Sequence, residues 1–364
     1  MANMNIGTPK FFPDLISYYR GRGTAIGTVA ATHAGTYKIG VDTGYTADEL
    51  FDLRPLNLVS FDTSADTDGH VLVNVVFSTA SHKQNFIAIL NHNLVTAVGK
   101  IRISAGDEAT DITAIDGANA DTADINWSTL IDASAVVEVV NADTITKSTD
   151  SKTAVIEPGT DGTTIITFTE QDLRYWAVQF EGNTTNTGAA TNGTWGSTDL
   201  TVGGIMIGET YEMPHASDIN IKRSIMYDQA KIQESAGGQR YGIASNLGRY
   251  VSSTSKSPFA LGTYGQNVHG GRLAYNMNFS YLASTDVMPD EYASLDFDDD
   301  QVVGDVWNLT DGPMRPFIFS IDKDSTGNNA ESEMIYARFA QNNLNMEQVA
   351  VNTWNVGMRI EEEF

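Results

Sequence analysis

The chain has 364 residues, with 46 Asp and Glu against 22 Lys and Arg, a formal net charge of −24 at pH 7, and no cysteine. Nucleic-acid binding relies on Lys and Arg displacing counterions from phosphates, so this acidity argues against direct nucleic-acid binding. Without cysteine there can be no disulfide, thiolate metal site or Cys nucleophile. No stretch approaches the roughly 18–20 apolar residues of a membrane span, and the N-terminus lacks a basic patch before an apolar run, so we expect synthesis in a cytoplasm without membrane insertion.

Hydrophobic residues make up 41% of the chain and charged residues 19%, and Thr, Asn, Asp, Ser and Gly fill the intervals. This composition is typical of mainly β proteins with many turns. The length predicts two domains with an appendage. We divide the chain into an N-terminal arm (1–48), a β-sandwich (49–208) and a second β-rich domain with a short helix (209–364).

The arm is predicted because the first fifty residues mix turn signals with a cluster of aromatic side chains. The cluster consists of Phe11, Phe12, Tyr18 and Tyr19. We interpret it as a set of assembly contacts that a partner orders, and not as part of a core.

Short runs of β-branched and aromatic residues, bounded by Asp and Gly clusters, predict the strands of the sandwich. The count suits one sandwich of eight strands, two of them in the segment 86–103. The other candidates are 51–61, 71–77, 135–140, 163–169, 175–180 and 204–208.

The segment 86–103 carries two buried-strand patterns around the polar triplet Asn91-His92-Asn93. Strands this apolar need a second sheet to bury them, and sandwiches turn at such polar corners. We expect His92 to satisfy backbone groups of the turn and not to bind a ligand. In the segment 175–180, strict alternation predicts that Trp176 faces the core while the opposite face meets solvent.

The second domain is predicted to hold a short helix at 288–295, opened by Pro289. The glycine pairs Gly237-Gly238 and Gly270-Gly271 are interpreted as hairpin turns, because they lack the strand–loop–helix context of a phosphate-binding loop. The predicted strands lie at 219–227, 271–282, 315–322, 333–339, 347–351 and 354–360.

Nothing in the sequence supports catalysis. The six histidines do not have metal-ligand spacing, and neither a Gly-x-Ser-x-Gly elbow nor a Gly-x-x-x-x-Gly-Lys loop is present. We therefore predict a protein that is not an enzyme and has no cofactor. Calcium stays as the alternative at two acidic clusters, which we interpret as solvated turns: Asp62, Asp66 and Asp68, and Asp296, Asp298, Asp299 and Asp300.

Two long polar loops, 106–127 and 181–201, hold the isolated residues Trp127 and Trp195. Long loops of this kind are often functional. A tryptophan there either pins the loop to its own domain or stacks on a sugar ring. Trp127, Trp195 and Tyr211 are the candidate ligand-binding residues.

Two blocks of the chain resemble structural proteins of tailed bacteriophages. The first is similar to the strand and corner of the discoidin-like, or galactose-binding-like, jelly roll of those proteins: Asn85-Phe86-Ile87-Ala88-Ile89-Leu90-Asn91-His92-Asn93-Leu94. The second is similar to their passage into a C-terminal β unit: Ile205-Met206-Ile207-Gly208-Glu209-Thr210-Tyr211-Glu212-Met213-Pro214, followed by 219–227, Gly237-Gly238, Arg249-Tyr250 and Arg315-Pro316-Phe317-Ile318. The resemblance spans roughly residues 50–364.

The resemblance implies a virion component of the tail, baseplate or neck, assembled in symmetric copies in the host bacterial cytoplasm. Its partners would be identical subunits and other virion proteins, with a host-surface glycan as a further partner of the outward loops. Three alternatives stay open: a carbohydrate-binding module that stacks sugars on the candidate aromatic residues, a glycan-cleaving enzyme, and a capsid-associated decoration protein.

Overall fold

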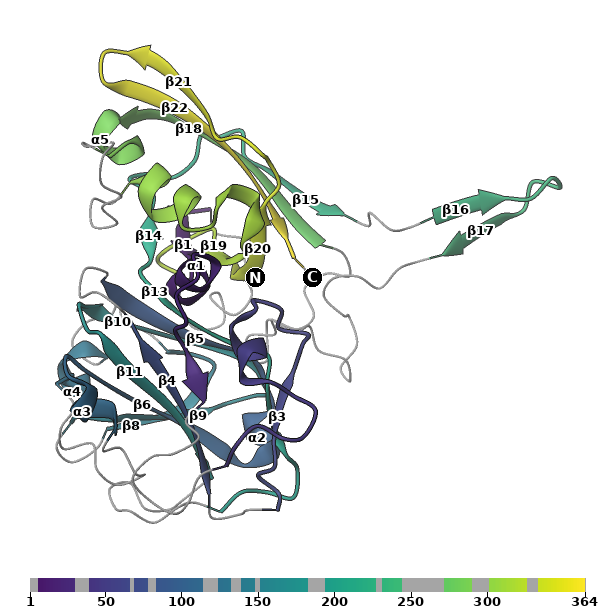
Figure 1. Ribbon diagram of the computed structural model, residues 1–364. Coiled ribbons are helices and arrows are strands. Elements are labelled where there is room, and N and C mark those ends of the chain that lie inside the picture. The colour runs from purple at the N-terminus through teal and green to yellow at the C-terminus, as the bar shows by residue number, and fades with distance from the viewer. Residues whose placement is uncertain are drawn as a thin grey trace. The chain divides into compact units, whose positions relative to one another are not determined.

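The computed structural model confirms that the protein is mainly β, with several antiparallel sheets (Figure 1). The chain forms two compact units, which are described one at a time. The N-terminal unit is built from Phe12–Thr210, and the C-terminal unit from Met1–Phe11 together with Tyr211–Phe259 and Tyr264–Phe364. The structure describes residues 6–29, 39–65, 69–77, 83–113, 124–131, 139–147, 151–182, 194–226, 231–243, 272–289, 301–325 and 333–363.

Two larger antiparallel sheets make up most of the N-terminal unit. The six-stranded sheet runs in the order β2 (Thr28–Val29), β4 (His70–Val76), β11 (Tyr175–Gly182), β6 (Gly99–Gly106), β9 (Ala154–Pro158) and β8 (Ala142–Lys147). The four-stranded sheet runs β13 (Gly204–Gly208), β5 (Gln84–His92), β10 (Gly162–Gln171) and β7 (Val139–Val140), and β3 (Val59–Phe61) pairs with β12 (Leu200–Val202). Short helices connect them: α1 (Leu15–Gly21), η1 (Ala47–Phe51), α2 (Leu94–Ala97), α3 (Ala109–Thr113) and α4 (Trp127–Leu130).

The two sheets meet through aromatic side chains. The ring centroids of Phe168 on β10 and Trp176 on β11 lie 5.4 Å apart. Trp176, Val178 and Phe180 are fully buried, as the alternation of β11 predicts. The prediction of a wet opposite face is wrong, because Gln179 and its neighbours on that face are buried as well.

The polar corner lies between β5 and β6, which belong to different sheets. His92 accepts a hydrogen bond at Nδ1 from the backbone N–H of Leu94 (3.4 Å), so Nε2 carries the proton and donates to Oγ1 of Thr164 (2.8 Å). The prediction that His92 serves the turn is confirmed. The imidazole thereby ties the start of α2 to β10.

The asparagines on either side of His92 bind two further segments. Asn91, whose backbone has a positive φ of 46°, donates from Nδ2 to the carbonyl of Pro55 (2.6 Å). Asn tolerates this left-handed conformation better than most residues. Asn93 accepts the N–H of Thr201 (2.7 Å) through Oδ1. The triplet therefore joins three separate parts of the unit at the point where the chain changes sheet.

The described residues of the predicted arm, 6–29 and 39–48, pack into the two units and do not form a separate arm. Phe12 is buried in the N-terminal unit, with its ring edge-on to Phe86 at 5.3 Å, and Tyr18 is buried as well. Tyr19 is half-buried, with its ring 6.2 Å from that of Phe77. Most of the aromatic side chains proposed as assembly contacts are thus packed within the chain itself. Burying such large rings stabilises the folded subunit. The predicted boundary at residue 208 lies two residues from the observed division.

An eight-stranded sheet organises the C-terminal unit. Its order is β14 (Tyr211–Glu212), β1 (Lys10–Phe12), β19 (Phe317–Ser320), β20 (Ile335–Phe339), β22 (Thr353–Glu362), β18 (Arg272–Ala283) and β15 (Lys222–Met226), with β21 (Asn345–Ala350) paired to β22. A separate hairpin consists of β16 (Lys231–Glu234) and β17 (Arg240–Ile243). The helices are α5 (Ser284–Val287), η2 (Val302–Asn308) and η3 (Gly312–Met314).

The helix predicted at 288–295 lies mostly outside the described residues, and a separate short helix, α5, precedes it. The helix α5 ends at Val287, and Met288 and Pro289 are not helical; residues 290–300 lie outside the described part. The N–H of Ala283 donates to the carboxylate of Asp286, three residues on, which fixes the start of α5 before the proline. The sequence analysis did not predict this short helix or its acidic cap.

The N-terminal strand β1 is an inner strand of the C-terminal unit's sheet. Phe11 is fully buried, and its ring lies 5.2 Å from Phe319, 5.6 Å from Phe317 and 6.3 Å from Tyr211. It was predicted to be an arm contact, and it is instead a central core residue of this unit.

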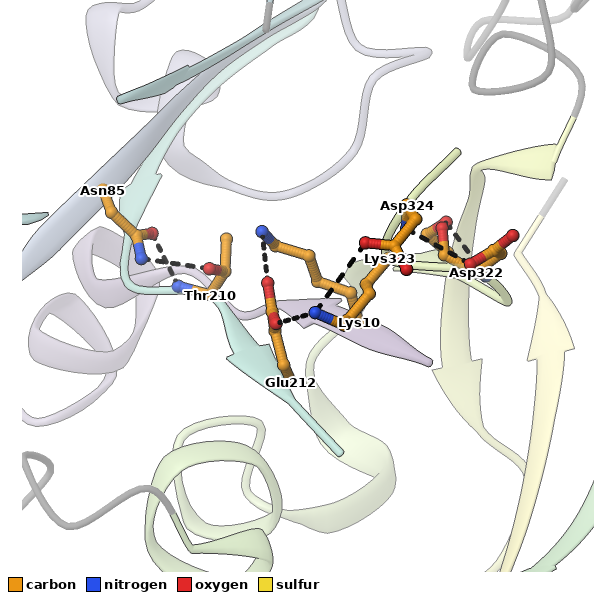
Figure 2. A network of polar contacts seen from close by, with 8 residues as sticks. Lys10, Asn85, Thr210, Glu212, Asp322, Lys323 and Asp324 are labelled. Atoms are coloured by element: carbon orange, nitrogen blue, oxygen red, sulfur yellow. Dashed lines mark hydrogen bonds and ion pairs between the residues drawn. The ribbon is translucent and has the colours of Figure 1, made fainter. Parts of the chain in front are cut away.

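Salt bridges hold the edge of the same sheet together (Figure 2). Glu212 on β14 accepts from Lys10 Nζ at 2.9 Å through Oε1 and faces Lys323 Nζ at 3.2 Å through Oε2. Burial opposes ionisation of Glu212, but the two ammonium groups outweigh it and lower the pKa of the carboxyl. The two salt bridges join β1, and Lys323 three residues beyond β19, to the strand β14.

Replacing Phe11 by Ala should destabilise the C-terminal unit by about 3–5 kcal/mol, because the lost ring leaves a cavity among three other aromatic side chains. Urea unfolding measures this loss, and Phe11→Leu, which keeps most of the volume, is the control that should lose less. If Phe11→Ala unfolds like the wild type, residues 1–11 behave as the arm that the sequence suggested.

Asp14 makes the stability of the N-terminal unit depend on pH. It is the N-cap of α1, accepts from the N–H groups of Ile16 and Ser17, and also accepts from Ile207 on β13 (3.1 Å). Burial raises the pKa of Asp14 to about 6, against the lowering effect of these donors. The native state therefore keeps a proton that the unfolded state has lost, so this group makes stability fall as the pH rises from about 4 to 6.

Asp14→Asn removes this titration. Between pH 4.5 and 7.5, the unfolding free energy of the wild type should fall relative to that of Asp14→Asn by about 2 kcal/mol. Urea unfolding at both pH values measures the difference. Asp161→Asn, which alters a carboxylate bonded to the exposed N–H groups of Val95 and Thr96, controls for losing an acceptor at a helix start. A pH-independent difference between wild type and Asp14→Asn would contradict the prediction.

Candidate functional site

The six-stranded sheet has buried polar side chains on the face opposite to Trp176. Arg102 on β6 and Glu181 on β11 form a two-pronged ion pair, with Nε and Nη2 of the guanidinium 2.9 and 2.8 Å from the two carboxylate oxygens. Both side chains are buried. Removing two charges from water is costly. A buried ion pair is therefore stable only when its hydrogen bonds are as well formed as the two between this guanidinium and carboxylate.

Neighbouring residues extend the layer. Lys100 on β6 pairs with Glu157 on β9 and, outweighing the opposing effect of burial, lowers the pKa of that carboxyl. Gln179 on β11 is the register partner of Arg102, and neither atom of its amide has a hydrogen-bond partner in the described part of the chain. Because Gln179 is only 1% exposed, this polar layer is part of the interior and does not form an open binding face.

The candidate aromatic platforms are buried, each within its own unit. Trp127 begins α4 with its ring edge-on to Phe168 at 5.4 Å, and it is fully buried. Tyr211 packs on Phe11 in the C-terminal unit. A sugar can stack only on an exposed ring, so the structure contradicts the stacking role of both residues.

Trp195 pins its loop. Its Nε1 donates to the carbonyl of Gly69 (2.6 Å), and its ring lies so close to Gly99 that a Cβ there would be 2.5 Å from it. Only glycine leaves room for the indole at this position. The pinning alternative is therefore the one that the geometry supports, and the stacking prediction for Trp195 is wrong for the same reason, since the ring is enclosed.

Neither calcium candidate can be built from the described residues. Asp66, Asp68, Asp296, Asp298, Asp299 and Asp300 lie outside them, while Asp62 is exposed. Within the described ranges, no group of three or more His, Asp or Glu side chains is placed to hold a metal ion. No described helix is long and apolar enough to cross a membrane.

The feature that stands out is in the C-terminal unit, between β15 and β18. These strands are antiparallel neighbours, and the register pairs Met226 with Arg272, so the chain leaves the sheet and returns to it at the same rung. An ordinary hairpin closes this gap with about two to five residues, whereas here residues 227–271 intervene. We call residues 219–272, which include the strand β15, the hairpin insertion.

The strands β16 and β17 within the hairpin insertion pair with each other and with no other described strand (Figure 1). The turn predicted at Gly237-Gly238 is confirmed: the N–H of Gly238 donates to the carbonyl of Ser235 (2.8 Å), and Gly238 takes the left-handed conformation, with φ at +80°. This is the three-residue hairpin loop in which glycine is favoured. The other pair, Gly270-Gly271, lies outside the described residues.

The hairpin exposes apolar side chains. Ile232 is 73% exposed because its cross-strand neighbour is Gly242, which has no side chain to cover it. Tyr241, on the other face, is 53% exposed. A hairpin of two strands is marginally stable alone in water, so a surface that covers these side chains would stabilise it.

The edge strand β15 adds to this surface. It pairs with β18 on one side and with no described strand on the other, and Ile225 on it is 51% exposed. An edge strand has unpaired N–H and C=O groups that can bind another strand, and basic side chains such as Lys222 are a common protection against unspecific pairing. The hairpin insertion thus combines an open edge, exposed apolar groups and basic residues.

Sequence reasoning found the Gly237-Gly238 turn but missed the hairpin insertion itself. The signal that it lacked is the pairing of Met226 with Arg272, which joins residues far apart in the chain.

No protein-family model, no curated protein and no solved structure matches this chain.

Trp195→Ala should lower the unfolding free energy by about 3–5 kcal/mol, since it removes a buried ring and its hydrogen bond. Thermal or urea unfolding measures the loss. Trp195→Phe is the control: it keeps the packing, loses the donor and should cost less. A variant that keeps full stability but loses binding on a glycan array would restore the stacking hypothesis.

Proposed function

We propose that the chain is a non-enzymatic structural protein of a tailed bacteriophage virion, assembling in symmetric copies in the tail, baseplate or neck. The hairpin insertion is the observation that carries this proposal. Its described hairpin, β16 and β17, has exposed apolar side chains and pairs with no other described strand. A monomeric protein gains no stability from exposed apolar side chains of this kind, whereas an assembling subunit can bury them against a neighbour.

The N-terminal unit supports the jelly-roll part of the proposal. Successive strands alternate between the two large sheets, from β4 to β5 to β6 and again from β9 to β10 to β11. Alternation of this kind is typical of jelly rolls, in which the chain crosses repeatedly between two sheets. The resemblance of residues 85–94 to galactose-binding-like modules belongs to the same proposal.

The aromatic residues that a glycan-binding function would use do not favour it. Trp127, Trp195 and Tyr211 each stabilise their own unit, so the carbohydrate-binding alternative lacks a named platform among them. A host-surface role for the N-terminal unit would have to use other loop residues.

Assembly is the first test of this proposal. Sedimentation velocity of the purified full chain over a range of concentrations should show a discrete oligomer, and negative-stain images should show a symmetric particle. A chain that stays monomeric throughout would overturn the assembly function. Mass spectrometry of purified tailed particles from the source culture tests the virion location separately, and the absence of the chain from such particles would overturn that part.

A further inference from the structure

We infer that copies of this chain join by extending a sheet: the edge strand β21 of one copy pairs, antiparallel, with the edge strand β15 of the next. Both strands belong to the C-terminal unit. The inference rests on the proposed assembly function and adds to it the two strands that make the contact and their register.

The two edges lie on opposite sides of one sheet. The strand β18 pairs with β15 on one side and with β22 on the other. The strand β21 pairs with the other side of β22, along residues 353–357, so the order is β15, β18, β22, β21 (Figure 1). Neither β15 nor β21 has a second neighbour among the described strands. Each copy therefore has two edges whose N–H and C=O groups can bind another strand.

The strand directions fit this pairing. Neighbouring strands in the series β15, β18, β22, β21 are antiparallel throughout, so β15 and β21 run in opposite directions. A second copy in the same orientation therefore presents its β15 antiparallel to β21 of the first copy, and the alternation continues from one copy into the next. Antiparallel pairing is the more stable form of a strand pair.

The apolar face of the sheet continues across the contact. Ile225 of β15 is on the core face, opposite the buried Leu273. Met346 of β21 is on that face too, opposite the buried Val356, and Leu344 packs against the same core cluster. Ile225 is 51% exposed, since β15 is the last described strand on its side of the sheet. A strand from a second copy would cover it and extend the core.

Complementary charges lie on the other face of the same two strands. Lys222 on β15 and Glu347 on β21 point away from the core, and both side chains are exposed. Within the described part of the chain, neither of them forms an ion pair. A lysine on an edge strand discourages unspecific pairing, and here it favours a partner strand that carries a carboxylate at the facing position.

The register that places Lys222 opposite Glu347 also suits the neighbouring positions. Ser224 is then opposite Asn345, which is a polar pair on the exposed face. Ile225 is opposite Leu344, which is an apolar pair on the core face. Charged, polar and apolar contacts thus form together, and such cross-strand pairs are what stabilise a sheet.

A head-to-tail contact fits the charges better than a two-fold one. Two β15 strands would bring together two copies of Lys222 and Arg223, and two β21 strands would bring together two copies of Glu347. Like charges on facing strands are destabilising. Pairing β15 with β21 joins opposite charges instead, and a contact between two different edges closes into a ring or continues as a helix.

Successive copies would be staggered along the strands. Through β18, Lys222 is level with Arg359 of β22, whereas Glu347 is level with Asn355, four residues earlier. Pairing Lys222 with Glu347 therefore shifts each copy relative to the one before. Sheets that close on themselves have a stagger of this kind, so the contact is compatible with symmetric copies around an axis.

Charge reversal in the full chain tests the contact. Lys222→Glu alone and Glu347→Lys alone each place like charges on facing strands, and each should raise the dissociation constant for assembly by about tenfold in sedimentation experiments. The double variant should assemble like the wild type, because opposite charges face each other again. The matched controls, Arg54→Glu and Glu108→Lys, reverse exposed charges in the N-terminal unit and should leave assembly unchanged.

A disulfide tests the register. Because the chain has no cysteine, chains with Ser224→Cys and chains with Asn345→Cys, mixed and oxidised, carry only the chosen thiols. Directly opposite residues of antiparallel strands lie within the Cα separation that a disulfide needs. The mixture should form disulfide-linked pairs of chains, and neither variant alone should. Ser224→Cys mixed with Val351→Cys, an exposed position at the β21–β22 turn, is the control and should stay unlinked.

The outcomes separate the inference from the function that it rests on. Assembly of both single charge variants at wild-type strength, with no disulfide in the mixture, overturns the inference and leaves the assembly function standing. A double charge variant that assembles as weakly as the single ones overturns the register. Disulfides between two Ser224→Cys chains, formed as readily as in the mixture, indicate a two-fold contact and also overturn the inference. A monomeric wild type overturns both the inference and the function.

Discussion

The corner Asn91-His92-Asn93 is the constraint on which the N-terminal unit depends. A chain that leaves one sheet for the other must expose backbone groups inside the protein, and buried N–H and C=O groups need partners. The three side chains supply them to Leu94, Pro55 and Thr201, and His92 adds a bond to Thr164. The two large sheets can therefore face each other with β5 and β6 on opposite sides.

The short segment 10–17 contributes buried side chains to the hydrophobic cores of both units. Phe11 completes the aromatic cluster of the C-terminal unit, while Phe12 and Asp14 complete the N-terminal one. Each unit thus depends on residues from the first part of the chain, and neither can finish packing without it. The C-terminal unit therefore includes residues from the start of the chain, Met1–Phe11.

Several charged side chains are held in fixed ion pairs within the two units. Charged pairs such as Arg102–Glu181 and Glu212 with its two lysines hold strands together inside each unit. The hairpin insertion does the opposite, leaving basic and apolar side chains exposed on a hairpin that has little support of its own. A structural subunit needs both kinds of region, a rigid body and a surface whose partner is another molecule.

Local pattern was enough to determine the mainly β class, the positions of strands such as β4, β10 and β11, the burial of Trp176 and the turn at Gly237-Gly238. These follow from alternation and from the backbone freedom of glycine, which act within a few residues. Tertiary structure alone decided that Phe11 and Phe12 are core residues, that the face of Gln179 is covered, that Trp195 fits against Gly99, and that β15 pairs with β18 although they are far apart in the sequence. Each of these depends on contacts between segments far apart in the chain, and a single sequence does not show which distant strands share a rung of a sheet.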